Sequence, residues 1–218
     1  PMLVQLKCKN RVCCKTDLRR TMELQRLIIQ RPLEFGSILH LKELIPVFHR
    51  WIQQQLIKDH LLIDVGDYLH LKRDPKLLLV AHEGTFSVIY SPEGLVLQYQ
   101  RRRPISGMFT QRLEKIWNTL QLASRLLEQE TTLEGKIHFE ANRFRIIVNE
   151  LLWTETTENA PKVLEETIRE AFRKEAGMSG FTVTCSMPET KERLLLEFEV
   201  TSIQDLDSTI SSVEQICA

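Results

Sequence analysis

The sequence predicts an α+β protein in which strands and helices occupy separate stretches of the chain. Short runs with strand character follow one another over residues 61–100, with turn residues between them. Residues 109–129 repeat apolar side chains at helical spacing over several turns. The rest of the C-terminal half alternates strand patterns with one further helix. We therefore expect an N-terminal helix plus an antiparallel meander, a long linking helix and a C-terminal ββαββ module.

The N-terminal part begins with an expected short strand at residues 23–30. A helix should follow from Pro46, whose missing N–H costs nothing in a first turn, to Asp59. Its apolar positions recur at helical spacing: Phe48, Trp51, Ile52 and Leu56. We interpret Trp51 as a core residue on this stripe.

The meander should consist of four strands. They are expected at residues 61–68, 77–81, 86–90 and 95–99. Residues 77–81 form an unbroken apolar run, which is typical of a strand buried on both faces. Turn signals separate the strands at Asp74 with Pro75, at Gly84 and at residues 91–94, where Pro and Gly suit a type I turn.

The second half should begin with the long helix. Residues 104–108 contain Pro104 and Gly107 and are expected to act as a linker before it. The helix at residues 109–129 carries one apolar stripe, and Trp117 lies on it as a further core residue. After it we expect strands at residues 136–140 and 143–148, which should pair with each other around residues 141–142. A helix at residues 161–176 and strands at residues 181–185 and 194–200 should follow.

These elements divide the chain into four expected regions. Residues 1–21 form a basic leader, with six basic residues against the single acid Asp17, and are expected to be disordered or not native. Residues 22–105 form the N-terminal α+β module and residues 106–200 the C-terminal helix plus ββαββ module. Residues 201–218 form a tail with a weak helical pattern.

Composition argues against several classes of protein. The formal net charge is +0, which disfavours a dedicated nucleic-acid or anionic-membrane protein. No apolar run is long enough to insert into a membrane, and no signal-peptide pattern is present. The five cysteines lack the spacings of zinc sites, which predicts reduced thiols in a cytoplasmic protein. The GxGxxG, Walker and GxSxG motifs of common nucleotide-binding proteins and hydrolases are absent.

Three segments stand out as motifs: IPVFHRWIQ at residues 45–53, LLIDVGDY at residues 61–68 and AHE at residues 81–83. Together they resemble an uncharacterised family of bacterial proteins. The family usually has Gly-His-Glu in the last segment, so Ala81 departs from its pattern. The resemblance extends over most of residues 40–200 and implies a bacterial, soluble protein, without implying any activity.

Four titratable residues in this region are candidates for catalysis. His82 and Glu83 follow an apolar strand, where a histidine beside a carboxylate can act as a general base or a metal ligand. Asp64 lies on the neighbouring expected strand, and His49 lies on the polar side of the helix. The hypothesis is that these four side chains and His70 converge on a divalent metal or a polar ligand, although the spacing specifies neither a metal nor a cofactor.

Further residues are candidates for ligand binding. Alternate residues of a strand share a face, so Tyr68 and His70 should lie on the same side as Asp64. Arg50 follows His49 on the helix. The run of Arg101, Arg102 and Arg103 at a strand end has the side chains that grip phosphate groups.

Each candidate also has a structural interpretation. Asp64 and His82 can make hydrogen bonds that fix the meander, and His49 and Arg50 can pair with nearby acids. A run of arginines at a strand end can simply guard the sheet edge against pairing.

Three classes of function therefore remain open. The first is a non-enzymatic accessory protein or protein-interaction module that binds another protein through its strand edges or an exposed aromatic face. The second is a small enzyme or a metal- or ligand-binding protein that uses the His/Asp/Glu cluster. The third is a nucleic-acid binder that uses Arg101, Arg102 and Arg103. We favour the first class, because every catalytic signal is ambiguous.

Overall fold

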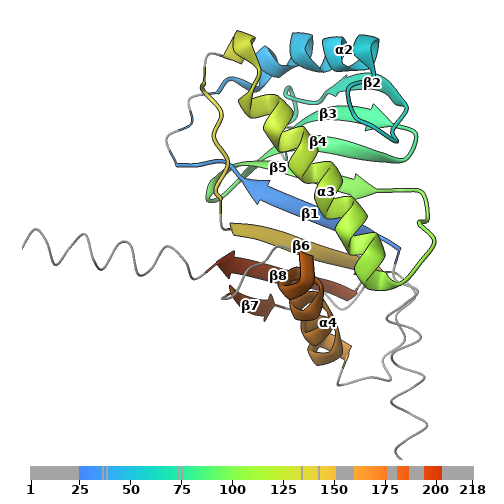
Figure 1. Ribbon diagram of the computed structural model, residues 1–218. Coiled ribbons are helices and arrows are strands. Elements are labelled where there is room, and N and C mark those ends of the chain that lie inside the picture. Colours follow the sequence, from blue (N-terminus) through green and yellow to red (C-terminus); the bar gives the residue numbers. More distant parts are fainter. Residues whose placement is uncertain are drawn as a thin grey trace, which may run out of the picture.

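Eight strands of the described residues form one antiparallel sheet in the computed structural model (Figure 1). The structure describes residues 25–35, 37, 39–72, 74, 76–133, 135–141, 143–150, 160–175, 181–186 and 194–202. The strands are β1 (Leu27–Pro32), β2 (Leu62–Asp67), β3 (Lys76–Ala81), β4 (Gly84–Ser91), β5 (Gly94–Arg101), β6 (Arg143–Glu150), β7 (Phe181–Ser186) and β8 (Leu194–Ser202). Their order across the sheet is β2-β3-β4-β5-β1-β6-β8-β7.

Helices accompany this sheet, so the expected α+β class is confirmed. The α-helices of the described residues are α2 (Leu44–Gln54), α3 (Phe109–Glu128) and α4 (Ala160–Glu175). Two short 3-10 turns, η1 (Leu41–Glu43) and η2 (Thr131–Leu133), precede α2 and follow α3. Figure 1 shows α3 and α4 lying across one face of the sheet, with α2 at its β2 end.

One row of buried side chains crosses six adjacent strands on the face that the helices cover. The strand register aligns its members one after another across the sheet. None of them is more than 1% exposed: Leu79, Phe86, Tyr99, Ile29, Ile146 and Phe198. Burial of apolar surface stabilises a folded protein by about 25 cal/mol per Å², so this row of large buried side chains stabilises the sheet.

Helix α3 covers the middle of this row because its apolar stripe faces the sheet. Leu113, Ile116 and Leu120 are each at most 2% exposed. Trp117 packs on Phe144 of β6, with ring centroids 4.4 Å apart. Both Trp117 and the buried Trp51 of α2 therefore contribute to the core, as their positions on apolar stripes predict.

A buried arginine on β1 ties the sheet to α3. Arg31 is 9% exposed, and its Nη1 donates a hydrogen bond of 2.8 Å to Oε1 of Gln121 on α3. Its Nε donates to the carbonyl of Glu140 at 3.3 Å, and the guanidinium lies over the ring of Phe139. Since a buried charge is costly without such partners, these contacts fix where α3 crosses β1.

Strand β1 sits between β5 and β6, so the sheet runs without a break from the N-terminal to the C-terminal strands. The expected module boundary near residue 105 lies between β5 and α3. The division into modules 22–105 and 106–200 stays a prediction, since both parts contribute strands to the same sheet.

The helix predicted from Pro46 to Asp59 is wrong at its C-terminal end. Helix α2 starts two residues earlier, at Leu44, and stops at Gln54, because Gln55 adopts a left-handed conformation with φ 49°. The Gln55 side chain then hydrogen bonds with both the N–H and the C=O of Leu62, each at 3.0 Å. This contact with the strand that follows is not visible in the periodicity of the helix.

The predicted pairing of residues 136–140 with residues 143–148 is also wrong. In the described residues, Phe139 forms only an isolated bridge with Leu33, beyond the end of β1. Strand β6 pairs instead with β1 on one side and β8 on the other. Alternating apolar residues indicate a strand, but they do not indicate its partner.

Three expectations lie outside the described residues or only partly within them. The leader at residues 1–21 and all but the first two residues of the tail at 201–218 are outside, while Thr201 and Ser202 belong to β8. The strand expected at residues 23–30 is described from Leu27 onward, as β1.

We predict that the substitution Gly84→Ala destabilises the protein strongly. A Cβ atom at Gly84 would lie 2.6 Å from the Gln100 carbonyl oxygen and 2.8 Å from the Tyr99 hydroxyl. Because the first of these is backbone of the adjacent strand, relief requires the strands to separate, at a cost of about 2–3 kcal/mol. Chemical denaturation monitored by circular dichroism measures this loss.

Gly66→Ala is the matched control within the same sheet. Its Cβ would approach Tyr68 Cε2 at 2.9 Å, but that ring is 42% exposed and is free to turn away. We expect a loss below about 1 kcal/mol. Equal stability of Gly84→Ala and the wild type would contradict the packing described for Tyr99.

Candidate functional site

The candidates on helix α2 lie on the protein surface. His49 is exposed, as its place on the polar side of the helix predicts. Arg50 forms an ion pair with Glu130, with 2.7 Å between Nη2 and Oε1. It also donates a long hydrogen bond to Thr132 in η2. Arg50 therefore connects α2 to the segment that follows α3, which agrees with its structural interpretation.

The candidates on β2 face solvent. Asp64 lies opposite Val80, and its Oδ1 accepts a hydrogen bond of 2.8 Å from the N–H of Val65. The register places Gly66 on the same face as Asp64, and the Tyr68 ring packs over Gly66. His70 is exposed in the turn after the strand.

His82 and Glu83 form the turn between β3 and β4, where they hold neighbouring backbone segments. The N–H of His82 donates to the carbonyl of Leu61 at 2.9 Å, and Oε2 of Glu83 accepts from the N–H of Leu61 at 2.8 Å. The carbonyl of Glu83 accepts from the N–H groups of Arg102 and Arg103. Burial alone would raise the pKa of Glu83, but the backbone N–H groups and the nearby histidines hold it below its ordinary value.

The three arginines at the end of β5 and directly after it differ in their surroundings. Arg102 and Arg103 are exposed. Arg101 is half-buried, and its Nε donates to the carbonyl of Arg103 at 2.9 Å. Only Arg101 of the three lines the cleft described below.

The predicted cluster is thus spread over α2, β2 and the β3–β4 turn. In the part of the chain that the structure describes, no group of three or more His, Cys, Asp or Glu side chains could hold a metal ion. A metal centre built from the predicted cluster and His70 gains no support from this geometry. The catalytic role of His49, Asp64, His82 and Glu83 stays a prediction.

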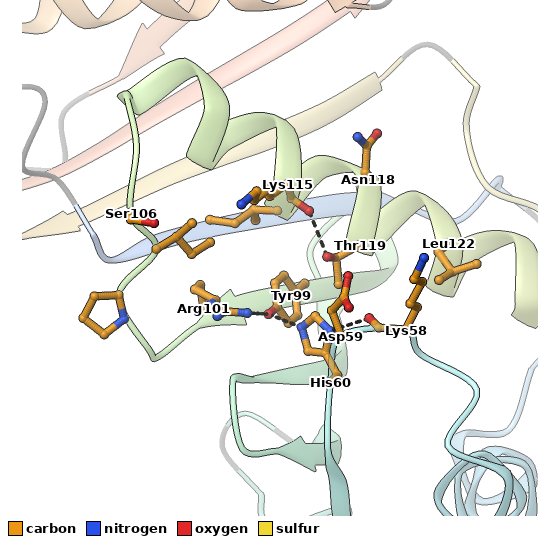
Figure 2. A pocket seen from close by; sticks show the side chains of 13 residues that line it. Lys58, Asp59, His60, Tyr99, Arg101, Ser106, Lys115, Asn118, Thr119 and Leu122 are labelled. Atoms are coloured by element: carbon orange, nitrogen blue, oxygen red, sulfur yellow. Dashed lines mark hydrogen bonds between the residues drawn. The ribbon is translucent and has the colours of Figure 1, made fainter.

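A cleft that the sequence did not indicate lies between α3 and the sheet (Figure 2). Its volume is about 490 Å³, which suits a small molecule. Three parts of the chain contribute its polar lining: the segment between α2 and β2, the end of β5 with the connection that follows, and α3. The polar residues are Lys58, Asp59, His60, Tyr99, Arg101, Ser106, Lys115, Asn118 and Thr119.

A hydrogen-bonded pair, His60 and Tyr99, forms the floor of this cleft. His60 Nε2 lies 2.6 Å from the Tyr99 hydroxyl, and His60 Nδ1 lies 3.1 Å from the Lys58 carbonyl oxygen. A carbonyl can only accept, so Nδ1 carries the proton and donates it, while Nε2 accepts from the tyrosine hydroxyl. The Tyr99 oxygen in turn accepts a long hydrogen bond of 3.4 Å from Nη1 of Arg101.

The pair is neutral at physiological pH because both residues are buried. Burial lowers the pKa of His60, and Arg101 adds to this effect, whereas the Lys58 carbonyl, Glu83 and Asp59 oppose it. Burial likewise raises the pKa of the Tyr99 phenol, against the opposing effect of Arg101. The pair therefore positions Arg101 without placing another charge in the cleft.

The sequence pattern does not single out Lys58 or His60. Lys58 falls within the helix expected to extend to Asp59, His60 lies between that helix and the next expected strand, and neither belongs to a motif. The cleft forms only when the end of β5 and the segment before β2 meet α3, and these parts are far apart in the sequence. The sequence shows Arg101 only as one member of a run of three arginines.

A second feature is the apolar surface at the β2 end of the sheet. Within the described residues β2 pairs with β3 alone and forms an edge of the sheet. Five large apolar residues in or beside this strand are exposed: Leu56, Leu61, Ile63, Tyr68 and Leu71. A β-bulge interrupts the register between Leu62 and Asp64, at Ile63.

No model of a known protein family matches this chain, and no curated protein is significantly similar to it. The resemblance of residues 45–53, 61–68 and 81–83 to a bacterial family therefore stays a prediction. None of the helices in the described ranges is long and apolar enough to cross a membrane.

We predict that His60 makes stability depend on pH below neutrality. Because its pKa is lowered in the folded state, the unfolded chain takes up a proton first as the pH falls. Stability should thus be insensitive to this group above the ordinary histidine pKa of 6.5 and should decrease as the pH falls from there toward the folded pKa. The slope is at most about 1.4 kcal/mol per pH unit.

Urea denaturation at a series of pH values measures this slope. His60→Gln keeps a hydrogen-bond acceptor for Tyr99 but cannot titrate, so it should flatten the dependence in this range. His49→Gln, at an exposed position on α2, is the control and should behave like the wild type. The same slope in His60→Gln as in the wild type would show that other groups are responsible.

Proposed function

We propose that this chain is a non-enzymatic protein-interaction module that receives an extended segment of another protein along strand β2. The observation that carries this proposal is an edge strand with exposed apolar side chains. In the described residues the outer side of β2 pairs with no other strand. Unpaired strand edges are ready templates for adding a further strand.

The backbone of β2 offers the groups that such a partner needs. The N–H of Tyr68 donates to the carbonyl of Lys76 on β3. Hydrogen-bonded residues alternate along an antiparallel pair, so Gly66 and Asp64 also face β3. Val65 and Asp67 therefore direct their backbone groups to the open edge.

Exposed apolar side chains lie in β2 and directly before and after it. Leu61 is 57% exposed, Ile63 is 53% exposed and Leu71, in the turn after β2, is 41% exposed. Single exposed apolar residues are ordinary, but several in and beside one unpaired strand, here called the apolar row, are typical of an interaction surface.

The charge of the edge favours a basic partner segment. Asp64 and Asp67 are exposed and form no ion pair with any described residue. A second copy of this chain pairing through β2 would bring four carboxylates together on two short strands, which is unfavourable. An extended segment that alternates apolar and basic residues fits both the apolar row and the carboxylates.

Two features of the β2 edge oppose the addition of another strand, and they limit how tightly a partner segment is expected to bind. Oδ1 of Asp64 already accepts a hydrogen bond from the N–H of Val65, and an incoming strand must replace it. The bulge at Ile63 bends the strand locally. We therefore expect binding that is moderate in strength and weakened by salt.

The other classes have less support. An enzyme or metal-binding protein that uses His49, Asp64, His82 and Glu83 would need these residues to meet, and they are spread over three elements. A nucleic-acid binder would need Arg101, Arg102 and Arg103 to act together, yet only Arg101 lines the cleft. Bacterial origin and a cytoplasmic location complete the proposal, on the basis of the resemblance and the cysteine pattern.

We predict that peptides of alternating leucine and lysine bind along β2. The variants Ile63→Lys and Asp67→Lys should each weaken binding about tenfold, which corresponds to roughly 1.4 kcal/mol. Methylating alternate backbone nitrogens of the peptide should abolish binding, since strand addition needs those N–H groups. Isothermal titration calorimetry measures the affinity, and slowed amide exchange at Val65 and Asp67 locates it.

Phe35→Lys is the matched control, because Phe35 is 101% exposed and lies near the β4–β5 turn rather than in β2. It should bind the peptide like the wild type. Binding that survives backbone methylation, or that Phe35→Lys weakens as much as Ile63→Lys, would show that strand addition is not the mode. Dimers that dissociate in Ile63→Lys on analytical ultracentrifugation would assign the edge to a second copy instead.

A further inference from the structure

Three basic side chains from three separate elements line the cleft beside α3. Lys58 comes from the segment between α2 and β2, Arg101 from the end of β5 and Lys115 from α3 (Figure 2). None of the three forms an ion pair with a described residue. Six other basic residues do form such pairs: Arg50, Lys76, Lys136, Arg143, Arg145 and Arg169.

Acidic side chains near the cleft do not balance this charge. Asp59 is the single carboxylate among the lining residues. Glu83 influences His60 and Tyr99 electrostatically, but its carboxylate is held by the N–H of Leu61. The cleft is therefore lined by three positively charged side chains and one carboxylate. Its concave shape concentrates the electric field of these charges.

Arg101 is held in place before any ligand binds. Its Nε is bonded to the carbonyl of Arg103, and its Nη1 reaches the Tyr99 hydroxyl, which His60 fixes in turn. Its Nη2 has no hydrogen-bond partner among the described residues. A guanidinium fixed in this way loses little conformational entropy when it binds an anion.

Uncharged polar residues also line the cleft. Ser106 contributes a hydroxyl, whereas the amide of Asn118 is directed away from His60 and Tyr99 in Figure 2. The Thr119 hydroxyl donates to the carbonyl of Lys115 at 2.8 Å, so it is not available as a donor to a ligand. Two lysines, a positioned arginine and a hydroxyl donor are groups that proteins use to hold a phosphoryl group.

From this geometry we propose that the cleft binds the phosphoryl group of a small molecule, with Arg101 as the positioned contact and Lys58 and Lys115 closing over it. The volume of about 490 Å³ leaves room for a small organic group attached to the phosphate. This site is separate from the β2 edge, so it goes beyond the proposed interaction function. Asp59 lowers the affinity for an anion and suits a ligand that also carries a hydroxyl or amino group.

Titration of the full chain with pyrophosphate at constant ionic strength tests the proposal. Lys58→Gln and Lys115→Gln should each weaken binding about three- to fivefold, and their combination should weaken it more. Asp59→Asn removes the opposing charge, and asparagine tolerates the left-handed φ of 62°, so this variant should bind more tightly. Isothermal titration calorimetry gives the affinities, and NMR shifts of Tyr99 and Arg101 give the location.

Lys162→Gln is the matched control, because Lys162 is exposed on α4 and lies outside the cleft. It removes the same charge and should leave pyrophosphate binding unchanged. Equal weakening by Lys162→Gln would overturn the proposal, since diffuse charge would then explain the binding. Absence of saturable binding, or unchanged affinity in both cleft variants, would overturn it too.

Further ligands identify the source of the phosphoryl group. Succinate binding as tight as that of pyrophosphate would overturn the proposal in favour of a general carboxylate site. Binding to phosphatidic acid vesicles that depends on Lys58 and Lys115 would support the phosphoryl chemistry and assign it to a lipid headgroup. Preference for a single-stranded oligonucleotide, lost on replacing Arg102 and Arg103, would overturn it in favour of a nucleic acid.

Discussion

The buried hydroxyl of Tyr99 needs a hydrogen-bond partner, and this requirement determines how the segment before β2 packs against the sheet. Tyr99 lies in the row of side chains that crosses the sheet, and it is 0% exposed. Its hydroxyl would cost free energy without a partner, and His60 supplies one at 2.6 Å. Because His60 precedes β2, this bond ties the segment before the edge strand to the Tyr99 side chain of β5. Gly84 makes the arrangement possible, since any larger residue would collide with Tyr99.

The two candidate surfaces share the short segment before and within β2. Lys58 and Asp59 line the cleft on one side of His60, and Leu61 begins the exposed apolar row on the other. Glu83 holds the same segment from the β3–β4 turn through the N–H of Leu61. Residues that looked catalytic in the sequence, His82 and Glu83, thus act here through hydrogen bonds that shape the surfaces.

Local patterns identified most elements but not their partners. The apolar stripe of α3 and the short strands β3 and β5 follow from periodicity, which depends only on neighbours along the chain. Residues 136–140 show that such a pattern does not predict strand pairing. Their alternating apolar residues indicate a strand, but Phe139 forms only an isolated bridge to Leu33. The end of α2 is a second example. Helical periodicity predicts a longer helix, but Gln55 ends it and its side chain hydrogen bonds with Leu62 of the next strand. For the sites, the run of three arginines was visible, whereas the different surroundings of Arg101 were not.

The α+β class, the positions of the main helices and many core residues can be predicted from the chain, because each follows from the spacing of side chains along a regular backbone. Three features become visible only in the folded protein: β1 lies in the middle of the sheet, Tyr99 meets His60, and Lys58, Arg101 and Lys115 line one cleft. These contacts join residues far apart in the chain. Their formation depends on strand register and helix packing over the whole sheet, which no local pattern records.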